Sequence, residues 1–129
     1  MGLAYTSIRV KDMKKSVAFY TRKLGLKVIG KREMPGELIV NLEDKATKQR
    51  LNLMWYAKSN RWYVPYKENG VELDHIMFQV PDAKKAHAKL LKGGATKATD
   101  VWEGKERSMG LVKDPNGIWI GVMSVKKKK

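Results

Sequence analysis

Cysteine is absent from the 129 residues of this chain. Disulfides, thiolate metal sites and cysteine nucleophiles are therefore excluded, and the composition suits a reducing compartment. No run of residues approaches the roughly 18 consecutive apolar positions that a membrane-spanning helix needs. The N-terminal stretch 1–10 also lacks the charged-then-apolar layout of a signal peptide. We therefore expect a cytoplasmic protein.

Acidic residues are also scarce: Asp and Glu number 13 against 27 Lys and Arg, which gives a formal charge of +14. The basic residues are spread along the chain, and four of them form the terminal run Lys126–Lys129. A solvated surface accounts for most of this excess. A strongly basic chain nevertheless favours an anionic ligand over a cationic one.

An internal repeat is the most informative feature of the sequence. The segment from Tyr5 and the segment from His75 align at a separation of 70 residues. In both copies an apolar stretch is followed by an aspartate, Asp12 or Asp82, and then by paired lysines. This pattern predicts a strand followed by a helix, because an aspartate at the N-cap accepts a backbone N–H bond.

Each copy predicts one helix and four strands in the order βαβββ. The helices follow the two aspartates. The expected strands are 3–10, 27–33, 37–42 and 50–56 in the first copy, and 73–80, 96–102, 107–113 and 118–124 in the second. Turn residues separate the strands, including Glu43-Asp44-Lys45 in the first copy. The clearest turn is the run Asp114-Pro115-Asn116-Gly117, which is a hairpin signal.

These elements predict a single α+β domain over 1–129, since domains of about 100–150 residues are common. We expect module one at 1–56, a linker at 57–70, module two at 71–125 and a lysine tail at 126–129. Four aromatic residues are candidates for the mouth of a cavity or for a dimer contact: Trp62, Tyr63 and Tyr66 in the linker, and Trp102.

The motifs resemble those of the vicinal oxygen chelate superfamily, which includes glyoxalase I, bleomycin-resistance proteins and extradiol dioxygenases. The segment Thr6–Leu26 is very similar to the opening of glyoxalase I, and Asp74–Asp82 and Lys113–Ile120 resemble parts of its second half. The resemblance covers nearly the whole chain. It implies two βαβββ modules that form a curved mixed sheet around a cavity, and a homodimer.

Members of this superfamily usually hold a divalent metal with four strand side chains, two from each module. The matching positions here are Tyr5, Asn52, His75 and Gly121. Such a metal needs about three or four imidazole or carboxylate donors, and His75 is the single normal ligand in this set. Asn52 offers a carbonyl oxygen, while Tyr5 is a poor ligand near neutral pH and Gly121 has no side chain. We therefore expect no cofactor, and Zn, Ni, Fe or Mn would be the metal if one bound.

The resemblance also implies ligand contacts. Arg9 matches an arginine that helps glyoxalase I to hold a carboxylate of glutathione, and Lys105 lies in a loop that approaches glutathione in the same family. A surface salt bridge is the competing role for both residues. Trp119 and Gly121 share a strand face, so the glycine is expected to leave an open space beside the indole that a flat ligand could enter.

The two histidines receive different expectations. His75 is expected to line the pocket, and Asp74 to point to the opposite face of the strand and so be no partner for it. His87 lies among lysines on the second helix and is expected on the surface. The carboxylates nearest to the expected site in sequence are Glu72, Glu103 and Glu106.

Three functions compete. The first is a metal-free protein that binds a small anionic or aromatic ligand in an apolar cavity with a few polar anchors. The second is a metalloenzyme similar to glyoxalase I or an extradiol dioxygenase, in which a metal polarises two vicinal oxygens and a carboxylate moves a proton. The third is nucleic-acid binding, which basic and aromatic neighbours such as Arg61-Trp62 would suit, although no known nucleic-acid motif accompanies them.

Overall fold

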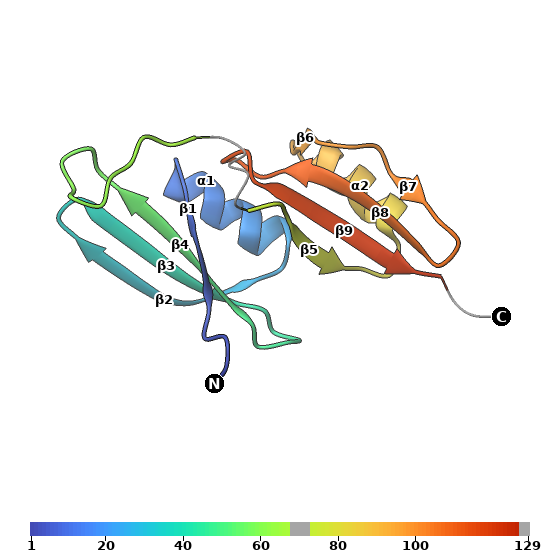
Figure 1. The fold of residues 1–129 in the computed structure, drawn as a ribbon, viewed down its shortest axis with the longest axis horizontal. Coiled ribbons are helices and arrows are strands. Elements are labelled where there is room, and N and C mark those ends of the chain that lie inside the picture. The colour runs from blue at the N-terminus through green and yellow to red at the C-terminus, as the bar shows by residue number, and fades with distance from the viewer. Residues whose placement is uncertain (68–72, 127–129) are drawn as a thin grey trace. The chain divides into compact units, whose positions relative to one another are not determined.

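The chain forms two compact units, Met1–Tyr66 and Lys67–Lys129, in a computed structural model that describes residues 1–67 and 73–126 (Figure 1). Each unit contains one mixed β-sheet and one helical segment, so the α+β class is confirmed. The first unit has the predicted βαβββ order, and the second repeats it except that two short strands, β6 and β7, replace the strand after the helix. No helix in the described part of the chain is long and apolar enough to cross a membrane. Part of the expected linker, Glu72 and most of the lysine tail lie outside the described residues.

The first unit is a four-stranded sheet with strand order β1-β4-β3-β2. Its elements are β1 (Thr6–Arg9), α1 (Met13–Ala18), η1 (Phe19–Lys23), β2 (Lys27–Met34), β3 (Glu37–Glu43) and β4 (Arg50–Tyr56). β1 runs parallel to β4, and the other neighbours are antiparallel. The parallel pair needs a long return of the chain, and β2 and β3 with their turns provide it.

The first helix begins as predicted at Asp12, whose carboxylate accepts a hydrogen bond of 2.9 Å from the Lys15 N–H. After Ala18 the helix widens into the π-helical turn η1, in which the Leu24 N–H donates to the Phe19 carbonyl at 3.2 Å. Phe19 and Tyr20, the first two residues of this turn, are both buried, and their ring centroids lie 5.3 Å apart in an edge-to-face arrangement. Gly25 then ends the segment with a φ of 77°.

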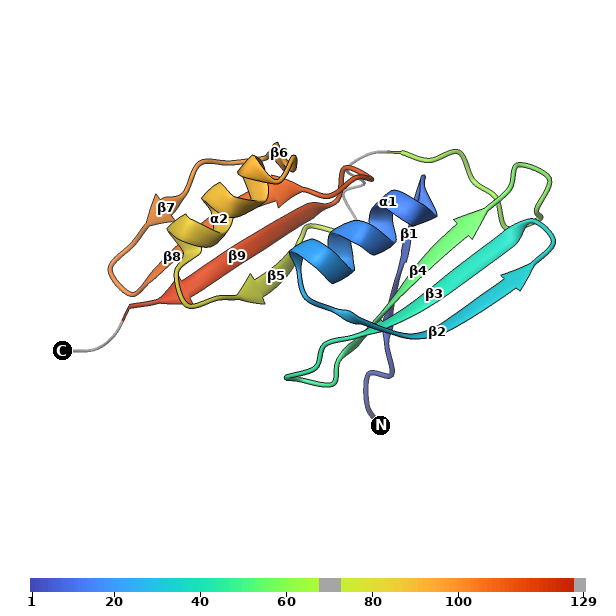
Figure 2. The same ribbon diagram turned by 180° about the vertical axis from the view of Figure 1, so that it is seen from behind.

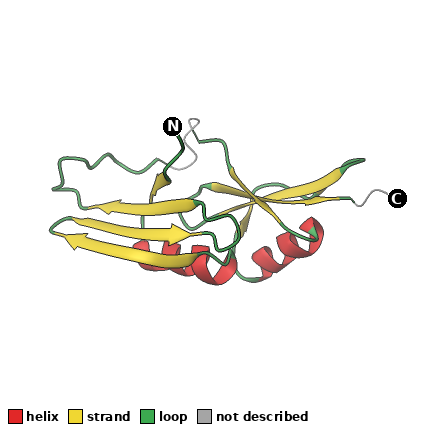
Figure 3. Cartoon of the chain, turned by 90° about the horizontal axis from the view of Figure 1, so that it is seen from below, coloured by secondary structure: helices red, strands yellow, loops and turns green. Residues whose placement is uncertain are grey.

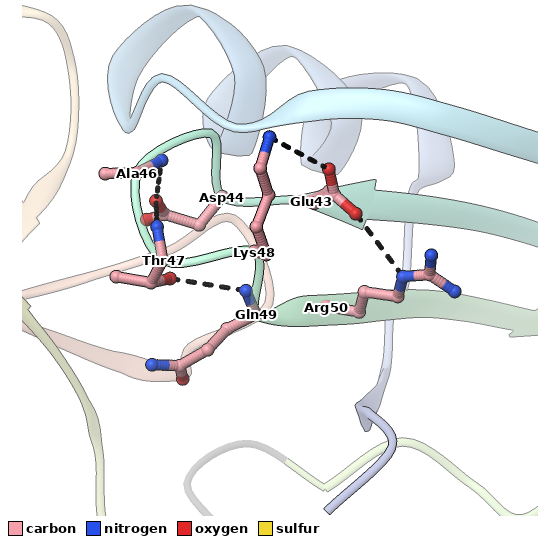
Figure 4. Close-up of polar contacts among 7 residues, drawn as sticks. All are labelled: Glu43, Asp44, Ala46, Thr47, Lys48, Gln49 and Arg50. Carbon is pink, nitrogen blue, oxygen red and sulfur yellow. Dashed lines mark hydrogen bonds and ion pairs between the residues drawn. The ribbon is translucent and has the colours of Figure 1, made fainter.

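The predicted turn after β3 is held by the side chain of Asp44 (Figure 4). Its carboxylate accepts hydrogen bonds from the Ala46 N–H at 2.8 Å and the Thr47 N–H at 3.1 Å. Lys48 adopts a positive φ of 63°, and its ammonium lies 3.9 Å from Glu43. Because Lys48 is largely exposed and the ion pair is long, the backbone bonds to Asp44 contribute more to the turn than the ion pair does.

The second unit is a five-stranded sheet in which β5, β9, β8 and β6 follow one another and β7 also pairs with β8. Its elements are β5 (Ile76–Gln79), α2 (Ala83–Lys92), β6 (Thr96–Lys97), β7 (Trp102–Glu103), β8 (Arg107–Lys113) and β9 (Trp119–Val125). Asp114 organises the predicted hairpin turn between β8 and β9. Its carboxylate accepts bonds of 2.8 Å from the N–H groups of Asn116 and Ile118.

The prediction of one continuous strand over 96–102 is wrong, because β6 ends at Lys97 and β7 begins only at Trp102. The N–H groups of Ala98 and Thr99 both donate to the Leu111 carbonyl at 3.0 Å, which interrupts the ladder against β8. Lys97, the last residue of β6, forms an ion pair of 2.7 Å with Asp100, which lies between the two strands, and the hydrogen bond from Lys97 holds the pKa of the Asp100 carboxyl below its ordinary value.

The surface placement predicted for His87 is also wrong, since the residue is only 5% exposed. Its Nε2 lies 2.9 Å from the Thr99 carbonyl and 3.3 Å from that of Leu111. The imidazole is therefore within hydrogen-bonding distance of two carbonyl groups at the interruption between β6 and β7. Gly110 makes room for the ring, because a Cβ there would lie 2.8 Å from His87 Cδ2. The polar neighbours of His87 on the helix concealed this role, which depends on contacts far along the chain.

Each helix covers one face of the sheet in its own unit (Figures 2 and 3). Strand alternation therefore divides every strand into residues that pack under the helix and residues on the opposite, open face. The buried set under the helices comprises Ile8, Val10, Val40, Leu42, Leu51 and Leu53 in the first unit and Val112, Ile120 and Val122 in the second. The side chains that could meet a ligand are those of the open faces and the strand ends.

The role of His87 is testable by substitution. His87→Phe keeps an aromatic ring but leaves the partly buried Thr99 carbonyl without its side-chain donor, so we expect the free energy of unfolding to fall by about 1–3 kcal/mol. Urea unfolding followed by circular dichroism measures the change. Lys89→Ala, on the exposed side of the same helix, is the control and should change stability by less than about 0.5 kcal/mol. Equal stability of His87→Phe and the parent would contradict this role.

Candidate functional site

Tyr5 and Asn52 are the first two of the four implied metal-ligand positions, and both lie in the first unit. Tyr5 is not on a strand as predicted, but one residue before β1, and it is 56% exposed. Asn52 lies on β4 opposite Asn41 of β3 and is buried. The Asn41 amide donates a hydrogen bond of 2.7 Å to Asn52 Oδ1. The carbonyl oxygen that a metal would need is therefore engaged by a neighbouring strand.

The other two positions lie in the second unit. His75 is one residue before β5 rather than on it, and its Nδ1 lies 2.7 Å from Asp74 Oδ1. The prediction that Asp74 is no partner is therefore wrong. The physical reason is that both residues precede the strand, where the alternation of side chains between two faces does not apply. Asp74 orients the imidazole so that Nε2 is the ring nitrogen left for other contacts.

The open space predicted at Gly121 is filled by Met77. β5 pairs with β9 so that Met77 lies directly opposite Gly121. A Cβ at position 121 would lie 2.6 Å from both Sδ and Cε of Met77, and 3.1 Å from Leu111 Cδ2. Trp119, on the same face of β9, is half-buried, and its Nε1 is a buried donor with no partner among the described residues. A flat ligand therefore has no ready-made space beside this indole.

The donor chemistry at these four positions does not fit the divalent metal that the superfamily resemblance implies. A hard or borderline metal of this kind needs imidazole and carboxylate donors, and the set here supplies one imidazole, one engaged amide, one phenol and no fourth side chain. Within residues 1–67 and 73–126, no cluster of three His, Cys, Asp or Glu side chains could hold a metal. We therefore derive no chemical step through a metal.

A cavity of about 260 Å³ lies elsewhere, wholly within the first unit. It is lined by the end of β1, the end of β4 and the segment 57–66 that follows β4. Arg9 lines it, with its guanidinium carbon 4.8 Å from the centre of the Tyr56 ring. The sequence analysis singled out Arg9 but missed Lys11 and Lys58, which also line the cavity. The alternating positions of Arg9 and Lys11 at a strand end were the available signal.

The segment 57–66 is tied to the rest of the unit by Asn60. The Asn60 side chain donates to the Gly36 carbonyl at 3.2 Å and accepts from the Trp62 N–H at 2.8 Å. Its own carbonyl accepts a bond of 2.9 Å from the Tyr63 N–H. These bonds hold the backbone that carries Tyr63 toward the cavity.

The aromatic candidates divide into two groups. Tyr63 and Tyr66 line the cavity, whereas Trp62 is 55% exposed and lies under the Arg61 guanidinium at 4.6 Å. Trp102 is 59% exposed in the second unit, where its indole lies against Gly104. Lys105 follows in the exposed loop before β8. The part of Lys105 in ligand binding stays a prediction.

Comparison with known proteins identifies the class of fold. The structure of the trypanothione-dependent glyoxalase I of Leishmania major superposes with a TM-score of 0.78 at 26% identity, covering 96% of this chain and 86% of that one. The antibiotic-binding protein TnmS3 of Streptomyces sp. CB03234 has the same fold, with a TM-score of 0.73 at 17% identity, over 98% of this chain and 97% of that one. Both an enzyme and a binding protein therefore share this architecture.

Sequence comparison places the chain within a family. Residues 2–122 match the profile of the Glyoxalase/Bleomycin resistance protein/Dioxygenase superfamily, and the chain belongs to this superfamily. It is 28% identical to the lactoylglutathione lyase of Escherichia coli O157:H7, over 98% of this chain and 94% of that protein. The lactoylglutathione lyase of Schizosaccharomyces pombe is 27% identical, over 98% of this chain and 48% of that protein. Membership in this superfamily is consistent with a small-molecule ligand and with a divalent metal. The donor set at the four positions is the evidence in this chain that concerns the metal.

The contact between Met77 and position 121 can be measured by a double-mutant cycle. Gly121→Ala places a methyl group against the Met77 thioether, so we expect the free energy of unfolding to fall by about 1–3 kcal/mol. In a Met77→Ala background the same change should cost less by about 0.5 kcal/mol or more, because the opposing side chain is gone. Urea denaturation of the four proteins gives both values. Identical costs in the two backgrounds would show that Met77 does not occupy this space.

Proposed function

We propose that this protein binds a small organic ligand without a catalytic metal, rather than acting as a lactoylglutathione lyase or dioxygenase. The observation that carries the proposal is the state of the four implied ligand positions. The Asn52 carbonyl oxygen accepts a hydrogen bond from the Asn41 amide, and Met77 fills the space at Gly121. A metal would have to share the Asn52 oxygen with the Asn41 amide and move Met77 aside, and His75 would be its one strong donor.

The ligand that we propose is anionic or aromatic. Arg9 carries the anionic part of the proposal, because a guanidinium presents a fork of N–H donors that matches a carboxylate. The excess of basic residues supports the same charge preference. We also propose a homodimer in the cytoplasm, and sedimentation velocity at micromolar concentration is the direct test of the dimer.

A metal-dependent lyase is the second candidate, and the relatives named lactoylglutathione lyase favour it. In that reaction class a carboxylate moves a proton while a metal polarises the substrate oxygens. Neither Asn52 nor Gly121 supplies a carboxylate at the implied positions. The two candidates therefore differ in metal content and in turnover, and both quantities are measurable on the purified protein.

The test is to equilibrate the protein separately with Zn²⁺ and with Ni²⁺, remove unbound metal, and determine the bound metal by elemental analysis. We expect well under one equivalent, because three of the four positions lack a strong donor. Formation of lactoylglutathione from glutathione and methylglyoxal should not exceed the uncatalysed rate in the same samples. The Escherichia coli relative, treated identically, is the positive control. One equivalent of metal together with turnover would overturn the proposal and establish the lyase.

A further inference from the structure

The open face of the first sheet carries a row of small polar residues. Gly30 on β2 lies opposite Asn41 on β3, and Asn41 lies opposite Asn52 on β4. Ser7 on β1 completes the row as the partner of Asn52. These four residues, the polar row, cross all four strands of the sheet (Figure 1). The side chains of the row lie on the face away from α1, because the residues next to them on β1, β3 and β4 are buried under the helix.

Asn52 holds an unused hydrogen-bond donor within this row. The residue is only 9% exposed, and an asparagine side chain donates through its NH2 group and accepts through its oxygen. The bond that its side chain makes with described residues enters the oxygen, which lies 2.7 Å from the Asn41 amide nitrogen. The Asn52 NH2 group therefore has no partner among the described residues, and unlike the Trp119 indole nitrogen it is not wholly enclosed. A largely buried donor without a partner costs free energy, which a ligand acceptor would recover.

Asn41 and Gly30 hold the Asn52 amide in this orientation. A Cβ at position 30 would lie 2.9 Å from Asn41 Oδ1, so the glycine makes room for the Asn41 side chain over β2. From there the Asn41 nitrogen reaches Asn52 on β4. The Asn52 amide cannot turn over without losing this bond, and its NH2 group therefore stays available as a donor.

Ser7 supplies an acceptor at the neighbouring position. It lies directly opposite Asn52 in the parallel pair of β1 and β4, and it is exposed. Within residues 1–67 and 73–126 its hydroxyl group has no hydrogen-bond partner. Because a hydroxyl oxygen accepts as well as donates, the open face presents a donor and an acceptor on adjacent strands.

The residues that flank the polar row add an ion pair on one side and apolar contacts on the other. Glu43 and Arg50 lie opposite each other and form an ion pair of 3.4 Å, so their charges offset each other. Beyond the other side of the row, Ile39 lies opposite Met54, and both are half-buried. A ligand on the polar row would therefore meet uncharged hydrogen-bonding groups next to an apolar pair, of which the methionine adapts its shape to a flat ring.

We propose that the polar row binds a carboxamide group of the ligand, with the Asn52 NH2 group donating to the ligand carbonyl and the Ser7 oxygen accepting from the ligand N–H. The apolar part of the ligand next to this group contacts Ile39 and Met54. This inference rests on the proposed function, in that the protein binds a small organic ligand without a metal, and it assigns that ligand an uncharged recognition group. Asn52 then acts through its nitrogen as a hydrogen-bond donor, which is a different role from a metal ligand that acts through oxygen.

The experiment uses benzamide as the probe and nuclear magnetic resonance of the isotope-labelled full chain as the readout, because asparagine NH2 groups give signals of their own. Asn52→Asp lacks this group and so identifies the Asn52 signals, which we expect to shift in a saturable way as benzamide is added. Acetophenone, which has a methyl group in place of the amide NH2, should bind about ten-fold or more weakly, because it leaves Ser7 unpaired. Benzoate should also bind more weakly at the same signals, since it brings a charge and no donor to an uncharged row.

Matched variants test the residues, with the backbone signals of β1 and β4 reporting binding. Ser7→Ala should weaken benzamide binding by about three-fold or more, whereas Ser59→Ala, the same change at an exposed position after β4, should leave it unchanged. Asn52→Asp puts an acceptor in place of the donor and should weaken binding by about ten-fold or more, measured with EDTA present because a carboxylate is also a metal donor. Its control is Gln79→Glu, the same amide-to-carboxylate change at an exposed position of β5. If Asn52→Asp does not fold, the two serine variants decide the test.

The outcomes are separable from those of the metal test. This inference is overturned if benzamide leaves the Asn52 signals unshifted, if acetophenone or benzoate binds there as tightly, or if Ser7→Ala and Ser59→Ala have equal effects. In each case the proposed function stands if the protein also lacks metal and lyase turnover. Metal binding with turnover would overturn the proposed function, whereas the Asn52 signals report on the polar row alone.

Discussion

Each β-sheet of this protein has a single helix to bury one of its two faces, and strand alternation then determines which side chains are left on the other face. On β4, Leu51 and Leu53 pack under α1, which turns Asn52 to the open face. On β8, Val112 packs under α2, which turns Leu111 away from it. The identity of the open-face residues follows from the need to bury the apolar ones, and the candidate sites of the protein are built from what remains.

The positions that match a metal centre show how neighbours accommodate a substitution. Where the superfamily resemblance implies a ligand, the chain has an asparagine at one position and a glycine at another. The asparagine has formed an amide pair across β3 and β4, and the glycine is covered by the thioether of Met77. Methionine suits this place because its unbranched, flexible side chain fills irregular gaps. Both contacts lie on the faces of the sheets away from the helices, where the side chains are partly buried and an unfilled space or an unpaired amide would still cost stability.

Some of the excess positive charge of the chain lies at a specific place, the cavity of the first unit. Most lysines lie on exposed surfaces, where solvent screens them. Arg9 and Lys11 differ because rings that come from later in the chain hold them at the wall of a cavity. The segment 57–66 creates this difference, and Asn60 holds that segment through bonds to Gly36 and to its own neighbours. The cavity is thus formed between the end of a strand and a segment that the sequence analysis predicted to be a linker.

The sequence by itself determined the repeated βαβββ order, the capped starts of both helices and the turns at Asp44 and Asp114, because these features depend on residues within a few positions of one another. It also identified the superfamily, whose signature residues are similarly local. Only the tertiary structure decided that His87 is buried, that Met77 closes the space at Gly121, and that Lys11 lies over Tyr66. Each of these contacts joins segments that are far apart in the chain, and a hydrophobic or charge pattern along one strand or helix carries no information about the side chain that will face it across the fold.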